Sequence, residues 1–202
     1  MSQPPQSGSL EQVLRCLAQL ASSPAFAVEM ERVVDFMGAG SFQPGDFIDA
    51  AGARFSLSLE DPAFGGAANW MPTQFKRVHT TQQLRPDPPY PHLALLGAPG
   101  RLQRADTAPR AMTDRGEAVG WMYTVDAVAV ASADRPDIAP RRAMGLMQGF
   151  EWLVRRNEHL GGLVQLIEAE GTPAPGGELE LRRIGIISGV MQRFAVYVNA
   201  IL

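Results

Sequence analysis

The chain has 202 residues, a formal net charge of −3 and a sequence pI near 5.6. Hydrophobic residues make up 46% of it and charged residues 19%, a composition that is typical of a globular protein and argues against a disordered chain. It lacks the basic excess of a dedicated duplex-DNA binder, and its one cysteine, Cys16, excludes an internal disulfide framework and a cysteine-based zinc site. We expect a single domain over residues 1–202.

The N-terminal residues 1–8 have neither the basic start nor the apolar core of a signal peptide. The longest apolar stretch, Val125 to Ala133, is interrupted by Asp126 and is too short to cross a bilayer. We therefore expect a protein that is made in a reducing cytoplasm and stays there, or in something assembled there.

A capped helix is predicted at the start of the chain. Ser9 and Gln12 have the spacing of a capping box, and an apolar stripe at helical spacing runs from Leu10 to Ala21. Residues 22–24, two serines and a proline, are expected to end this helix. The next segment, 26–36, begins with alternating apolar and polar residues, which predicts a strand.

The segment 37–92 is predicted to be a long irregular insertion. Glycines are frequent from 37 to 52, residues 54–60 alternate as a half-buried antiparallel strand does, and prolines crowd 86–91. A short apolar strand is expected over 92–96.

Residues 97–116 contain proline and glycine and have no apolar period, so we expect an exposed loop or a protruding hairpin arm. Arg101, Arg104, Arg110 and Arg115 lie in this segment and are candidate interface residues. Their guanidinium groups would suit acidic groups of a neighbouring subunit, or DNA phosphates. A solvated loop without a partner is the third alternative.

The periodicity of the apolar residues is clearer after residue 118. A long strand is predicted over 119–133, a turn over 134–140 and a helix over 139–157, with Arg141, Arg142, Glu151, Arg155 and Arg156 on its polar face. Gly145 and Gly149 are four residues apart and leave one helix face bare. Another element of this chain or a neighbouring subunit could approach closely there, so both glycines are candidate interface residues.

The remaining elements are predicted to be strands. A Leu-Gly-Gly sequence at 160–162 is expected to end the helix, and strands follow over 163–168, 178–188 and 191–202, with a turn over 171–177. The element order predicts an α+β fold, with a mostly antiparallel sheet and an N-terminal helix and one long helix packed on one face.

No catalytic, cofactor or metal motif stands out. The sequence from Gly97 to Arg101 lacks the lysine that ends a phosphate-binding loop, and His79, His92 and His159 are not at ligand spacing from one another. We expect structural roles for these histidines. Asp126 interrupts the long strand, and we expect it to face solvent or to pair with an arginine across the sheet.

The C-terminal half has a pattern that resembles the tail terminator (tail completion) proteins of long-tailed bacteriophages. It begins with the aromatic start of the long strand at 121–125, followed by an Asp-containing turn and an amphipathic helix. Residues 157–164 then read Asn-Glu-His-Leu-Gly-Gly-Leu-Val, ahead of paired closing strands. The resemblance covers about 90–202 together with the first helix, while 37–92 departs from compact family members.

The resemblance implies a structural virion protein with neither enzymatic activity nor a cofactor. It implies a homohexameric ring that caps the tail tube, ends its polymerisation and joins the tail to the head connector. The expected partners are further copies of the chain, the tail tube protein, the head–tail connector or neck protein and, transiently, DNA in the channel, but no membrane. The location implied is the tail or neck of the virion, assembled in the host cytoplasm.

Two alternatives stay open from the sequence. The first is another neck or head–tail joining protein of similar build. The second is a small cytoplasmic ligand-binding protein or enzyme, with a pocket between the sheet and the insertion that uses Asp126, His92 or Tyr123.

Overall fold

The computed structural model describes residues 9–38, 47–48, 50–55, 70–80, 89–103, 120–181 and 185–199. The main body is a five-stranded sheet in the order β3-β4-β5-β7-β6. Its strands are β3 (Arg77–His79), β4 (His92–Gln103), β5 (Gly120–Ala133), β6 (Leu166–Leu181) and β7 (Gly185–Asn199). The sheet is mostly antiparallel, because only the β3–β4 pair is parallel.

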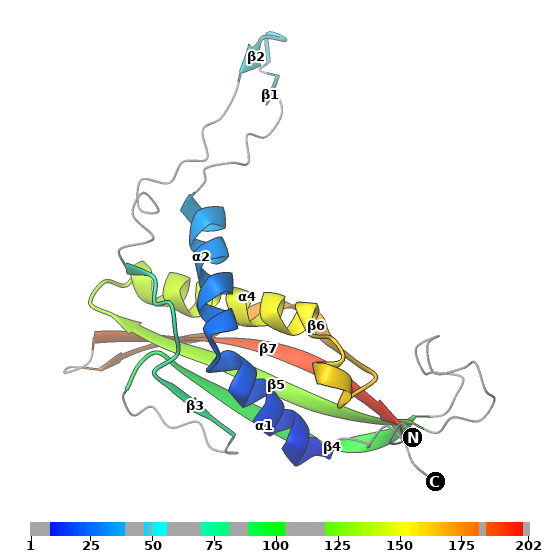
Figure 1. Ribbon diagram of the computed structural model, residues 1–202. Coiled ribbons are helices and arrows are strands. Elements are labelled where there is room, and N and C mark those ends of the chain that lie inside the picture. The colour runs from blue at the N-terminus through cyan, green and yellow to red at the C-terminus, as the bar shows by residue number, and fades with distance from the viewer. Residues whose placement is uncertain are drawn as a thin grey trace.

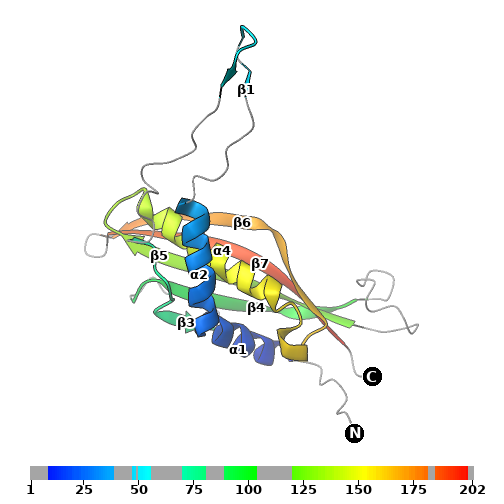
Figure 2. The same ribbon diagram turned by 45° about the horizontal axis from the view of Figure 1, so that its top comes forward.

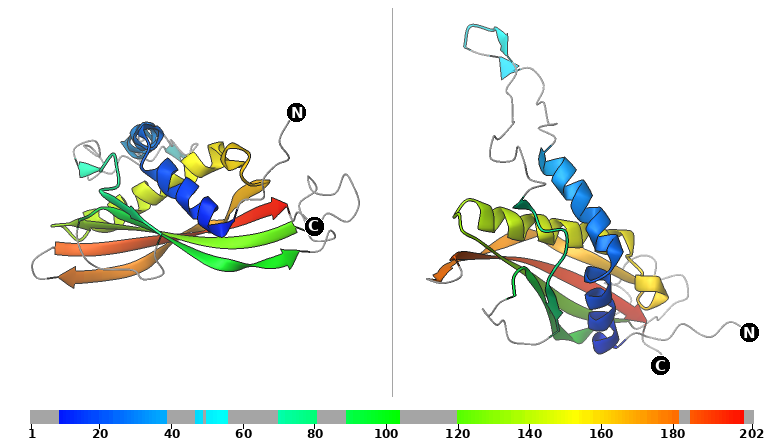
Figure 3. Two further views of the ribbon diagram at one scale, coloured as in Figure 1. Left: turned by 60° about the horizontal axis from the view of Figure 1, so that its bottom comes forward. Right: turned by 60° about the vertical axis from the view of Figure 1, so that its left-hand side comes forward.

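Helices cover one face of this sheet (Figure 1, Figure 3). The helix α1 (Leu10–Ala21) packs on β4, and α4 (Ile138–Arg156) lies along β5, β7 and β6. A third helix, α2 (Pro24–Gly38), crosses over α4 (Figure 2). The expected α+β fold is therefore present.

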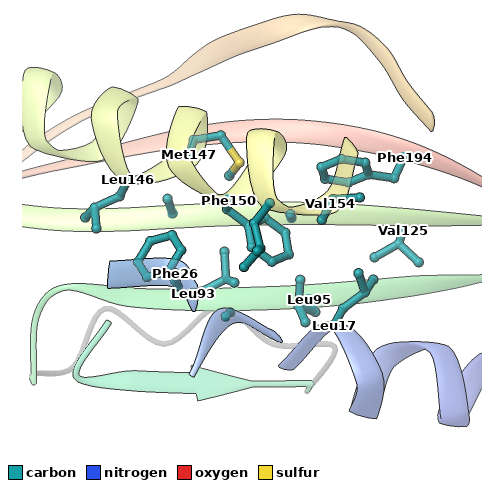
Figure 4. Packing of buried hydrophobic residues seen from close by; sticks show 14 of the residues in the cluster. Leu17, Phe26, Leu93, Leu95, Val125, Leu146, Met147, Phe150, Val154 and Phe194 are labelled. Carbon is teal, nitrogen blue, oxygen red and sulfur yellow. The ribbon is translucent and has the colours of Figure 1, made fainter. Parts of the chain in front are cut away.

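The N-terminal helix forms for the predicted reason. Ser9 and Gln12 make a reciprocal capping box, in which each side chain accepts a hydrogen bond from the backbone N–H of the other residue. Val13 and Leu17 on the apolar stripe of α1 are fully buried. They join the central core between the helices and the sheet, where Phe26, Phe150 and Phe194 meet (Figure 4).

The strand predicted over 26–36 is wrong, because these residues belong to α2. Proline is well tolerated at the first position of a helix, so Pro24 begins α2 rather than only ending α1. The buried residues Phe26, Met30 and Val33 follow the helical spacing of four and three, and this period outweighs the alternation at the start of the segment.

Gly145 and Gly149 face elements of the same chain. A Cβ atom at Gly149 would lie 2.6 Å from Sδ of Met30, and one at Gly145 would lie 2.6 Å from Cε of Met71. Both glycines are buried on α4, where Met30 of α2 and Met71 occupy the space that their missing side chains leave. They serve packing within the subunit and do not form a surface for a neighbouring one.

Arg142, which we expected on the polar face of α4, holds the N-terminal part of this helix in place through two hydrogen bonds. Arg142 donates from Nε to the Trp70 carbonyl oxygen and from Nη1 to the Ser132 carbonyl oxygen, each over 2.7 Å. Its burial lowers the pKa of the guanidinium group, and the charge of Asp134 opposes that effect. Arg142 therefore links α4, β5 and the chain at residue 70, and it is a structural residue.

The segment 37–92 contains two different parts. Residues 70–80 belong to the main body, where Phe75 stacks on Phe26 with ring centroids 4.8 Å apart and β3 joins the sheet. By contrast, β1 (Phe47–Ile48) and β2 (Arg54–Phe55) pair only in a separate two-stranded sheet. This β1–β2 hairpin stands away from the body (Figure 1, Figure 2, right panel of Figure 3). The strand expected over 54–60 lies, beyond residue 55, outside the described residues.

Two strand boundaries differ from the predictions. The strand β4 continues to Gln103, which pairs with Gly120 of β5. Residues 97–103 therefore form a strand of a hairpin, which was one of the two alternatives predicted for this segment, and not a loop. Residues 171–177 belong to β6 rather than to a turn, and the closing part of the sheet has two long strands where we expected three. Register shifts on both sides of Ala174 and Pro175 accommodate the prolines and glycines of β6.

Truncation of the α1 stripe should destabilise the whole domain. We expect Leu17→Ala to lower the free energy of unfolding by about 2–5 kcal/mol, because the fully buried side chain would leave a cavity. The exposed neighbour Gln19 is the matched control, and Gln19→Ala should change stability by less than about 0.5 kcal/mol. Urea unfolding measures both, and equal small effects would mean that α1 is peripheral.

The contact between Gly149 and Met30 predicts a coupling between two substitutions. Gly149→Ala should lower stability, because the clash with buried Met30 outweighs the gain of up to about 1 kcal/mol in helix propensity. In a Met30→Ala background the same change should be neutral or stabilising. A double-mutant cycle in urea measures this, and an identical effect in both backgrounds would contradict the proposed packing.

Candidate interaction surface

An exposed phenylalanine beside a half-buried tryptophan marks the outer side of the helical layer. Phe36 of α2 is 62% exposed, and its ring meets that of Trp152 on α4 edge to face, with centroids 5.9 Å apart. A phenylalanine that stays this exposed gains little from burial in its own chain. Exposed aromatic residues of this kind are enriched where proteins bind one another.

Three arginines surround this aromatic pair: Arg32 of α2, and Arg155 and Arg156 of α4. Arg32 donates from Nη1 to Oε1 of Glu29 over 3.2 Å, and Nε of Arg156 forms an ion pair with the same oxygen over 2.9 Å. The arginine side chains are 48% and 56% exposed, whereas that of Glu29 is 5% exposed. The carboxylate thus lies beneath the two guanidinium groups and orients them.

Arg155 is held in the same way. Its Nε and Nη2 atoms lie 2.8 and 2.7 Å from Oε1 of Glu151, which is buried although we expected it on the polar face. The Arg155 side chain itself is 62% exposed. Buried carboxylates and outward guanidinium groups give this surface a positive outer layer, and its arginines are already positioned to bind carboxylates.

Two grooves meet at Trp152 and Arg155. One, of about 510 Å³, lies between α4 and β6 and is also lined by Met144, Gln148 and Thr172. The other, of about 410 Å³, is lined by Arg32, Trp152, Arg155 and Arg156. We call the residues Phe36, Trp152, Arg32, Arg155 and Arg156 the aromatic–arginine surface. Its combination of tryptophan and arginine is typical of the energetic centre of a protein–protein interface.

Sequence reasoning missed this surface because it placed 26–36 in a strand. The helical period of Phe26, Met30 and Val33 was the signal that could have revealed it, because a helix puts Arg32 and Phe36 on one side. The interface role expected of the arginines in 97–116 stays a prediction. Arg101 lies in β4 opposite Met122, and Arg104, Arg110 and Arg115 lie outside the described residues.

The three residues expected of a ligand pocket do not converge. Asp126 pairs with Arg193 of β7, from Nε to Oδ1 over 2.7 Å and from Nη2 to Oδ2 over 3.1 Å, as expected for a cross-sheet pair. This pair raises the pKa of Arg193. The strand alternation points Tyr123 to the helix-covered side of β5 and Asp126 to the other side.

His92 is buried at the start of β4. Its ring stacks on Tyr90 and meets His79 edge to face, with centroids 5.2 and 5.3 Å apart. Burial, with the charges of His79 and Arg77, lowers the pKa of His92 to about 4. Within the described part of the chain, no group of three or more His, Cys, Asp or Glu residues could hold a metal ion.

The free face of the sheet carries a second perturbed group. Tyr197 of β7 donates a hydrogen bond to Glu168 of β6 over 3.1 Å. Burial raises the pKa of this phenol to about 12, and the hydrogen bond and the carboxylate charges act in the same direction. A phenol with such a pKa stays neutral at physiological pH, so Tyr197 acts as a hydrogen-bond donor in the sheet.

No described helix is long and apolar enough to cross a membrane. No family model and no curated protein matches the chain.

The buried neutral His92 predicts a pH-dependent stability. The unfolded state takes up a proton below about pH 6.5 and the folded state only near pH 4, so stability should fall as the pH drops through this window. The slope for one histidine is at most about 1.4 kcal/mol per pH unit. Urea unfolding of the protein and of His92→Phe from pH 4 to 7 isolates the effect. A stability difference that does not change with pH would contradict it.

Proposed function

We propose that this chain is a structural subunit of a ring that caps a phage tail tube, as tail terminator proteins do. The observation that carries the proposal is the aromatic–arginine surface, a preorganised protein-binding surface on the outside of the helical layer. A subunit of an assembly needs such a surface, and a solitary globular protein does not.

The order of elements in the C-terminal half supports the same proposal. The long strand β5 leads through a turn with Asp134 and Asp137 into the amphipathic helix α4, and Leu160–Gly162 then redirects the chain into the antiparallel pair β6–β7. Gly161 and Gly162 have φ values of 68° and 89°, which glycine adopts readily, so the Leu-Gly-Gly sequence forms the reversal itself. The resemblance predicted this succession.

In this proposal the protein lies at the tail or neck of a virion and binds its own copies, the tube protein and the connector. Tube binding by strand addition would meet an obstacle at one sheet edge. Pro173 and Pro175 lie in the edge strand β6 and lack the N–H that a further strand needs. Regular stretches of β6 lie on both sides of these prolines, over 166–170 and 178–181.

Electron microscopy of the purified chain, alone and mixed with a tail tube protein from the same source, tests the proposal. We expect rings of about six copies, the number that the resemblance implies, closed by head-to-tail contacts and seated at tube ends. Tubes that keep growing in the presence of the protein would contradict it. Binding to the connector alone would identify a different neck protein.

A further inference from the structure

We infer that the β1–β2 hairpin of one copy docks on the aromatic–arginine surface of the next copy. The inference rests on the proposed function for the ring and adds the contact that builds it. The contact joins two surfaces that differ in chemistry and that each copy of the chain carries.

The receiving side is rigid, aromatic and positive. Phe36 and Trp152 present ring edges and faces, and the guanidinium groups of Arg32, Arg155 and Arg156 are fixed from beneath by Glu29 and Glu151. Because the arginine side chains are already held, binding to a partner's carboxylates loses less side-chain entropy than at free arginines. The partner that fits is a short acidic segment with apolar side chains.

The stretch of chain that carries the β1–β2 hairpin has this composition, and its acidic residues all lie outside the described residues. Between Gly38 and Trp70 there are four acidic residues, Asp46, Asp49, Glu60 and Asp61, and one basic residue, Arg54. The same stretch contains seven large apolar residues: Phe42, Phe47, Ile48, Phe55, Leu57, Leu59 and Phe64. An acidic and apolar segment therefore complements a basic and aromatic surface.

The position of the hairpin favours a second copy over the same chain. The β1–β2 hairpin stands away from the helices and the main sheet, and residues 50–53 at its turn are exposed (Figure 1, Figure 3). A two-stranded hairpin alone is marginally stable in water, so it gains from a surface to pack on. Because donor and acceptor surfaces differ, the contact is head-to-tail, and repeated contacts of this kind form a ring when the rotation between copies closes.

Self-association measured by light scattering over a range of concentrations tests the receiving side. Phe36→Ser should weaken association at least about tenfold, because it removes an exposed anchor. Met191→Ser is the matched control: it also removes an exposed large apolar side chain, but from the other face of the sheet. Neither change removes a buried side chain, so both variants should keep the stability of the parent chain.

The hairpin side is tested by reversing its charge. Asp46→Arg with Asp49→Arg should weaken association to a similar degree, since these residues flank the β1 segment in the sequence. Arg155→Glu would disturb buried Glu151, so the receiving arginines are better neutralised than reversed. Arg155→Gln combined with the aspartate reversal should give no additional loss, because both act on one contact.

Cross-linking decides which chain supplies the hairpin. In a Cys16→Ala background, a tagged Thr172→Cys chain is mixed with an untagged Ala50→Cys chain and treated with a short bismaleimide. Thr172 lines the groove and Ala50 lies beside the β1–β2 hairpin. We expect a cross-link between the two chains, and none when Met191→Cys replaces Thr172→Cys.

Each outcome separates this inference from the proposed function. If rings cap tubes, but Phe36→Ser does not weaken association and no cross-link forms, the inference is wrong and the proposed function stands. Head-to-tail association through this contact without tube binding would support the inference and contradict the tube-capping function. A chain that stays monomeric at every concentration, or cross-links only within itself, would overturn the inference.

Discussion

The close contact between α2 and α4 is the constraint on which the rest of this structure depends. Gly149 has no side chain where Met30 of α2 packs, and a Cβ atom at Gly145 would lie 3.4 Å from Sδ of Met37 of α2, so the two helices can cross at short range. The crossing buries Phe26 in the core and leaves Phe36 beside Trp152. A bulkier residue at the crossing would separate the aromatic pair and move Arg32 and Glu29 away from Arg156.

The sequence predicts most of the fold where periodicity is long. The capped helix α1, the strand β5 and the helix α4 lie close to their predicted bounds, because each carries a sustained apolar stripe. The wrong secondary-structure predictions come from segments in which the residue pattern is short. In α2, the apolar and polar residues alternate over too few residues to indicate a strand. In β6, the prolines led to the prediction of a turn, but β6 continues to pair with β7 through them with a shifted register.

The candidate site could be predicted only in part, since it joins residues that are far apart in the chain. The sequence analysis placed Arg155 and Arg156 on the polar face of α4, but it also placed Glu151 there. The buried position of Glu151 depends on packing and not on its own helix pattern. Glu29 is hidden by the α2–α4 crossing, and no local pattern indicates that it orients two arginines.

The central claim is that this chain assembles head-to-tail through the aromatic–arginine surface. A cryo-electron microscopy reconstruction of the assembled particle tests it most directly. The account predicts a closed ring in which a neighbour's hairpin, with Phe47 and Phe55, covers Phe36 and Trp152 of each copy. A ring in which Phe36 faces open solvent, with the copies joined through the free face of the sheet, would contradict it.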